Sequence, residues 1–91
     1  MKVLAVCGFG VGSSMALKMQ LEKAFKELGV TADLDNTDIM NAPGMGADAI
    51  FTSAEFAAQL EGNVACPIYA VKQFMNYQEV LETVKKYIET V

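Results

Sequence analysis

The sequence contains no histidine and no arginine, and these two absences restrict the chemistry open to it. Histidine is the commonest general base near neutral pH, and arginine is the side chain that clamps a phosphate with two hydrogen bonds. Any reaction must therefore use a thiol, hydroxyl groups, carboxylates, lysine or backbone amides. The basic residues are all lysine and the formal net charge is −4, whereas nucleic-acid binding requires a concentrated positive face. We expect no nucleic-acid partner.

Cysteines are few, and long apolar runs are missing. Cys7 and Cys66 lie far apart and outside any CxxC or zinc-ligand spacing, which favours free thiols in a reducing compartment. No metal site and no cofactor are expected. The apolar run before Cys7 is too short for a secretory signal, and no run approaches the ~18 apolar residues of a membrane span. We expect a cytoplasmic chain without direct membrane insertion.

The size and the order of the patterns predict one α/β domain that spans residues 1–91. The chain has 91 residues, of which 53% are hydrophobic, enough for one core. Short apolar or alternating runs predict strands at residues 3–6, 31–36, 47–51 and 64–71. Helices are predicted up to Gly29, from a capping box of Thr52 and Glu55 to near Gly62, and from Asn76 and Glu79 onward. This alternation predicts a parallel sheet with helices on both faces, and Pro67 suggests that the last strand lies at an edge.

A glycine-rich turn follows the first predicted strand, with the sequence Cys7-Gly8-Phe9-Gly10-Val11-Gly12-Ser13-Ser14. In doubly wound sheets, ligands bind beyond the carboxyl ends of the strands. Glycine lets an anion approach the backbone closely, and no proline removes an amide hydrogen between Gly8 and Ser14. The helix that follows directs the positive end of its dipole at the same place. We therefore predict a phosphate site made of the backbone amides of residues 8–14.

Cys7 is the predicted nucleophile at this site. A free thiol has a pKa of ~8.5, and a helix N-terminus commonly lowers this value, so that thiolate forms without a histidine base. Ser13 and Ser14 are expected to cap the helix and to offer hydroxyl groups. The alternative is a buried, inert cysteine before a tight turn, but its position directly before the glycines favours function.

Two enzyme classes share parts of this pattern. The spacing from Cys7 to Ser13 and Ser14 resembles the loop of low-molecular-weight tyrosine phosphatases, but those enzymes need arginine at the position of Ser13 and an acid from an Asp-Pro loop. A dinucleotide site that uses Asp33 or Asp35 would need glycine at the position of Ser13. Relay of a phosphoryl group is thus favoured over hydrolysis. A thiol phosphatase-like enzyme and a regulatory anion-binding module remain alternatives.

The segment from Val3 to Met15 resembles the IIB components of the bacterial phosphoenolpyruvate-dependent sugar phosphotransferase system. The similarity is to the lactose, ascorbate and galactitol group, and most of all to the ascorbate type. It implies a four-stranded parallel sheet of order 2-1-3-4, a topology shared with low-molecular-weight tyrosine phosphatases. It also implies a phosphocysteine at Cys7, a IIA partner that donates from phosphohistidine, and a IIC membrane permease that presents a sugar or ascorbate-like substrate. Phe9 stands where relatives often carry a small or polar residue, which bears on partner docking.

Several other residues have simpler interpretations. Cys66 is expected in the core within the fourth strand. Lys72 is expected at the end of that strand, where it is solvated or, as the alternative, attracts phosphate. Thr52 and Ser53 are interpreted first as a helix cap and second as a wall of the site. The loop that carries Met40 and Met45 either meets a protein partner or is an ordinary loop.

Overall fold

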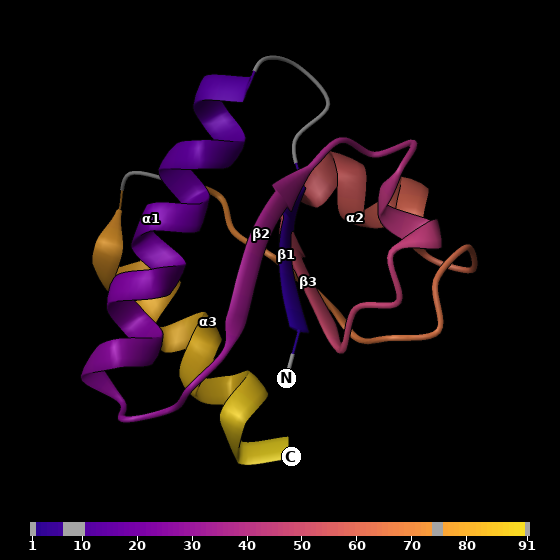
Figure 1. Cartoon of the computed structure of the whole chain (residues 1–91). Coiled ribbons are helices and arrows are strands. Elements are labelled where there is room, and N and C mark those ends of the chain that lie inside the picture. Colours follow the sequence, from indigo (N-terminus) through magenta and orange to yellow (C-terminus); the bar gives the residue numbers. More distant parts are fainter. Residues whose placement is uncertain (1, 7–10, 74–75, 91) are drawn as a thin grey trace.

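A four-stranded parallel sheet organises the chain (Figure 1). The computed structural model describes residues 2–6, 11–73 and 76–90, with the backbone alone at 11–14. The strands are β1 (Lys2–Val6), β2 (Asp33–Thr37), β3 (Ala49–Thr52) and β4 (Ile68–Ala70). Their order is β2-β1-β3-β4, and each neighbouring pair is parallel. This confirms the expected sheet order 2-1-3-4.

The central strand β1 is the most deeply buried part of the sheet. It pairs with β2 from Lys2 opposite Asp33 onward, and with β3 from Val3 opposite Ala49 onward. Successive side chains of a strand point to opposite faces, so Val3 faces one core cluster and Leu4 faces the other. A strand covered on both faces has no need of polar side chains, which explains the uninterrupted apolar run.

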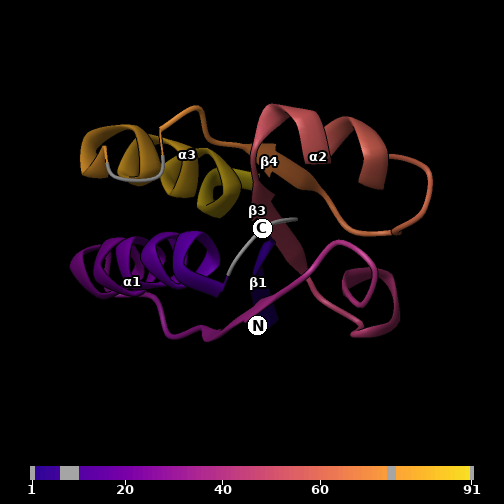
Figure 2. The same ribbon diagram turned by 90° about the horizontal axis from the view of Figure 1, so that it is seen from above.

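Helices cover both faces of the sheet, as predicted. The helices α1 (Val11–Glu27) and α3 (Tyr77–Thr90) lie on one face. The other face carries α2 (Ala54–Leu60) and the short 3-10 helix η1 (Ala42–Gly44), and Figure 2 shows the two layers on either side of the sheet. The larger core cluster lies under α1 and α3, and the smaller one lies under α2 and η1.

The predicted end of the first helix is confirmed at Gly29. This glycine has a φ of +72°, which glycine adopts without steric cost. Its N–H donates to the carbonyl of Lys26 at 3.1 Å, and the N–H of Val30 donates to the carbonyl of Phe25 at 3.0 Å. These two bonds form the Schellman arrangement that closes many helices.

Two sequence predictions about β3 and β4 need correction. The strand β4 covers Ile68–Ala70 and not the longer range 64–71, although it does lie at a sheet edge. Pro67 precedes it and supplies a carbonyl to the N–H of Ile50 at 3.1 Å. The cap of α2 is Ser53, whose hydroxyl accepts from the N–H of Phe56 at 3.4 Å. Thr52 belongs to β3 and bonds elsewhere, so it does not cap this helix.

The predicted start of the last helix is confirmed. The side-chain oxygen of Asn76 accepts from the N–H of Glu79 at 3.3 Å, which is a capping bond. The apolar face of α3 packs into the larger core, where Val80, Val84 and Tyr87 are buried.

Candidate functional site

The candidate site lies at the carboxyl edge of the sheet. Because the strands are parallel, they end together at this edge, at residues Val6, Thr37, Thr52 and Ala70. Cys7, Gly8, Phe9 and Gly10 lie outside the described residues. Both flanks of the turn are placed, since Val6 ends the central strand and Val11 begins α1. The turn thus connects the carboxyl end of β1 to a helix N-terminus, as the sequence predicts.

The second half of the predicted phosphate site is the first turn of α1. Val11, Gly12, Ser13 and Ser14 are all helical, so Ser13 and Ser14 lie within the helix and are not its caps, which corrects the prediction. The first N–H groups of a helix have no acceptor within the helix. No acidic residue lies in this first turn, so no side chain of that turn neutralises the positive end of the dipole. This backbone can bind an anion.

Thr52 links the neighbouring strand to the start of the turn. Its side chain is fully buried, and its hydroxyl donates to the carbonyl oxygen of Val6 at 2.8 Å. That carbonyl belongs to the peptide group that joins Val6 to Cys7. The carbonyl of Thr52 in turn accepts from the N–H of Val71 at 2.7 Å. Three strand ends are therefore tied together beside the turn.

The carboxylate of Glu79 binds the backbone just after β4. The N–H groups of Lys72 and Gln73 donate to the two carboxylate oxygens of Glu79, at 2.6 Å and 3.1 Å. This pair of charge-assisted bonds attaches the segment after β4 to the first turn of α3. Lys72 itself is exposed, as its solvated interpretation predicts.

The acidic and methionine residues of β2 and the loop after it are mostly exposed to solvent, and Asp33 lies at the start of β2, away from the carboxyl edge. Asp33 and Asp35 are exposed on β2, as the solvated interpretation of both predicts. Asp38 fixes the following loop by accepting from both the backbone and the side-chain amide of Asn41, at 2.8 Å and 3.0 Å. Met40 is 86% exposed, whereas Met45 packs against the smaller core cluster and is only partly accessible.

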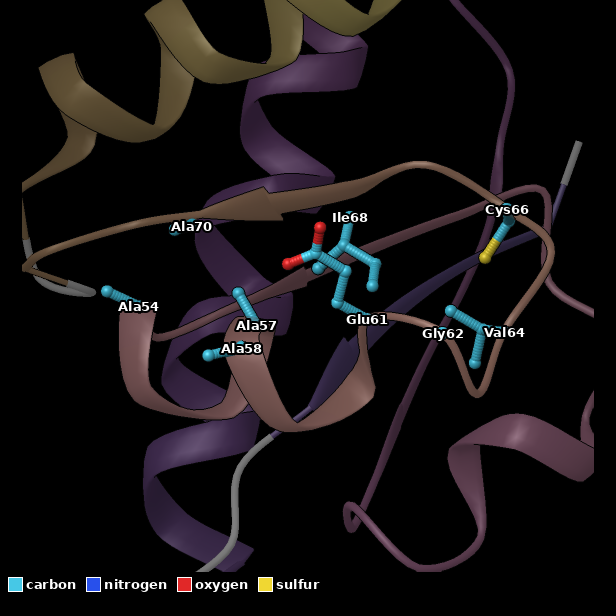
Figure 3. Close-up of a pocket in the computed structure, with 9 residues that line it drawn as sticks. All are labelled: Ala54, Ala57, Ala58, Glu61, Gly62, Val64, Cys66, Ile68 and Ala70. Atoms are coloured by element: carbon cyan, nitrogen blue, oxygen red, sulfur yellow. The ribbon is translucent and has the colours of Figure 1, made fainter.

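The second thiol lies at the opposite edge of the sheet. Cys66 was expected in the core within the fourth strand, and this prediction is wrong. It precedes β4 and is only partly buried against the smaller core cluster, because the strand begins at Ile68. It lies at one end of a shallow pocket between α2 and β4, with Ala54 at the other end (Figure 3). Burial raises the pKa of the Cys66 thiol, which makes it a poor nucleophile near neutral pH.

The described residues contain neither a metal-binding cluster nor a helix that could span a membrane. Within residues 2–6, 11–73 and 76–90, no three cysteine, aspartate or glutamate side chains are grouped so that they could hold a metal ion. No helix among the same residues is long and apolar enough to cross a membrane.

The sequence and the fold are both similar to those of known proteins. A family model described as "PTS system, Lactose/Cellobiose specific IIB subunit" matches residues 2–86. The chain is 33% identical over 86 residues to the ascorbate-specific PTS system EIIB component of Mycoplasma pneumoniae, which covers 92% of this chain and 90% of that protein. The solved lactose-specific IIB domain of Streptococcus pneumoniae superposes with a TM-score of 0.68 at 16% identity, over 99% of this chain and 92% of that one.

Proposed function

We propose that this chain, which belongs to the family of lactose/cellobiose-specific IIB subunits of the sugar phosphotransferase system, carries a phosphoryl group on Cys7. The observation that carries the proposal is the place of Cys7 in the fold. It follows directly after the buried central strand, and the N-terminus of a 17-residue helix begins four residues later. A helix N-terminus stabilises both a thiolate and the phosphoryl oxygens that would surround it.

The proposed transfer has two steps. First, the Cys7 thiolate attacks the phosphorus of a phosphohistidine on a IIA partner. The S–P bond forms, the P–N bond breaks, and the histidine nitrogen keeps the electron pair. Second, a substrate hydroxyl oxygen attacks the same phosphorus, the S–P bond breaks and the hydroxyl proton passes to solvent. Backbone amides at positions 8–14 stabilise the charge on the equatorial oxygens in both steps, as is general for phosphoryl transfer.

The chain favours relay over hydrolysis. A thiol phosphatase needs an arginine to bind the transition state, and Ser13 stands at the corresponding position. It also needs an acid that is free to protonate the leaving group. At the described part of this edge, Glu79 accepts from two backbone amides and Asp38 accepts from Asn41. Both carboxylates are therefore already engaged in hydrogen bonds that hold the segments at this edge.

The partners follow from the family and are part of the proposal. A phosphorylated IIA protein donates to Cys7, and a IIC membrane permease presents the sugar or ascorbate-like acceptor. The chain then works in the cytoplasm, between these two partners. Because the permease holds the acceptor, the identity of the substrate is not encoded in this domain.

Transfer from a phosphorylated IIA protein tests the proposal. The purified chain is incubated with phosphorylated IIA of the ascorbate type and, separately, of the lactose type, and its mass is measured. We expect one added phosphoryl group with the lability of an S-phosphate. The group should be absent in Cys7→Ser and present in the matched control Cys66→Ser. Labelling that survives Cys7→Ser would remove Cys7 as the nucleophile.

Two further outcomes would favour the alternatives. Hydrolysis of a generic aryl phosphate by the purified chain would favour a thiol phosphatase. Binding of inorganic phosphate without transfer from either IIA protein would favour a regulatory anion-binding module.

A further inference from the structure

Thr52 is a buried polar side chain whose hydroxyl has no part in the mechanism above. Among the residues whose side chains are described, it is the one polar or charged residue that is buried, at 0% exposure. The hydroxyl donates to the carbonyl oxygen of Val6 at 2.8 Å. Tyr87 also carries a hydroxyl and is 2% exposed, but it lies in the larger core, on the other face of the sheet.

Packing alone does not explain a hydroxyl at this position. Side chains alternate along β3, so Thr52 lies on the same face as Ile50, which belongs to the smaller apolar cluster. Burying a hydroxyl costs free energy that its hydrogen bond only offsets. Valine has nearly the same shape, is equally favoured in strands and carries no polar group to bury. The presence of the hydroxyl therefore indicates that its hydrogen bond to the Val6 carbonyl has a function.

The group that it holds is the peptide before Cys7. The paired register of β1 and β3 ends at Ala5 opposite Phe51, and Val6 and Thr52 are the next residues along. The hydroxyl of Thr52 extends the link between these strands by one residue. Thr52 is itself fixed, because it pairs with Ala70 on β4 and its carbonyl accepts from Val71.

We propose that Thr52 is a positioning residue for Cys7, which fixes the direction in which the chain leaves β1. The carbonyl of Val6 and the nitrogen of Cys7 share one planar peptide group, so holding that oxygen restrains the plane from which the turn begins. In-line transfer requires the sulfur to be aligned with the bond that breaks, and small misplacements reduce the rate steeply. The inference rests on the proposed function, because it names a residue that serves the same transfer.

Two substitutions separate positioning from packing. Thr52→Val removes the hydroxyl and keeps the packed volume, whereas Thr52→Ser keeps the hydroxyl and removes a methyl group. The rate of transfer from phosphorylated IIA is measured in a Cys66→Ser background and scaled to the folded fraction. We expect Thr52→Val to lower kcat about tenfold with KM unchanged, and Thr52→Ser to stay within about twofold of the parent. If packing were what matters, the transfer rate of Thr52→Ser would instead fall further than that of Thr52→Val.

The proposal is overturned if Thr52→Val transfers within about twofold of the parent, or if the serine variant falls as far as the valine variant. If the parent accepts no phosphoryl group from either IIA protein, the proposed function fails. The effect of Thr52 on Cys7 is then tested by alkylation. Iodoacetamide labelling of Cys7 is then followed against pH. Positioning predicts that Thr52→Val shifts the midpoint toward the ordinary value of ~8.5 while Thr52→Ser does not. The positioning role would be refuted if the parent, Thr52→Val and Thr52→Ser gave the same dependence of labelling on pH.

Discussion

At the scale of single residues, one tyrosine joins the two helices on the larger core. The hydroxyl of Tyr77 on α3 donates to the carboxylate of Glu27 on α1 at 2.5 Å. The ammonium group of Lys23 lies 4.6 Å from the centre of the same ring, within the range of a cation–π contact. The accepting carboxylate is the main reason that the pKa of Tyr77 rises to about 12, with burial as the second cause.

This raised pKa gives the contact a defined pH dependence. An unfolded tyrosine ionises near pH 10, so the bond stabilises the folded chain fully below about pH 10 and loses that effect as the pH rises toward about 12. Burial also raises the pKa of Tyr87, so spectrophotometric titration of phenolate should show more than one late-titrating group, and Tyr77→Phe should remove the one near pH 12. The control Glu27→Gln should keep this group but move it to lower pH. Loss of a group that titrates near pH 10 in Tyr77→Phe, with the group near pH 12 retained, would contradict the assignment.

At the scale of elements, the ends of helices were predictable where the signal is local. Gly29 ends α1 and Asn76 begins α3 through bonds to residues within a few positions, so the sequence alone indicates both. Thr52 was assigned to a helix cap because Glu55 follows it at the right spacing. Its actual partner, Val6, is 46 positions away, and no local pattern reveals such a bond.

The candidate site also has features that local sequence patterns predict and features that they do not. The place of α1 soon after the end of β1 was predictable from the apolar run and the glycines that follow it. The start of α1 at Val11, which puts Ser13 and Ser14 inside the helix, was not predictable because glycine and serine are common in both loops and first turns. The length of β4 was overestimated because residues 64–67 are apolar yet lie before the strand.

The stop at Gly29 can be tested by substitution. An added Cβ would meet no atom within 4 Å at this position, so Gly29→Ala is opposed by the backbone conformation alone. We expect a loss of about 1–2 kcal/mol in the free energy of unfolding, measured with urea. Gly44→Ala is the matched control, since its Cβ also meets nothing and its φ is not positive, and it should stay within about 0.5 kcal/mol. Equal effects of both substitutions would argue against the αL explanation.

At the scale of the whole molecule, an aromatic cluster joins the elements on one face of the sheet. Phe25 of α1, Phe51 of β3, Tyr69 of β4 and Tyr87 of α3 have ring centroids 5.2–6.5 Å apart in the contacts they make. Most of these pairs meet edge to face, which is a favoured arrangement for aromatic rings. Each ring comes from a different element, so the cluster connects two helices and two strands.

Removal of one ring should therefore destabilise the whole domain. Phe25 is 2% exposed, and Phe25→Ala should lower the free energy of unfolding by about 3–5 kcal/mol. Met19→Ala on the same helix is the control, because Met19 is 66% exposed and its loss should change stability by no more than about 0.5 kcal/mol. Circular dichroism in urea measures both. A loss below about 1 kcal/mol in Phe25→Ala would show that the cluster does not support the fold.

The position of α3 in the chain has a consequence for biosynthesis. This helix follows every strand in sequence, yet it supplies Val80, Val84 and Tyr87 to the larger core. While the ribosome is still making the chain, α1 and the sheet can form but one side of that core has no cover. Phe25 and Phe51 then face water until the last helix leaves the exit tunnel. We therefore expect a nascent chain that lacks α3 to bind chaperones, because incomplete domains expose apolar surface.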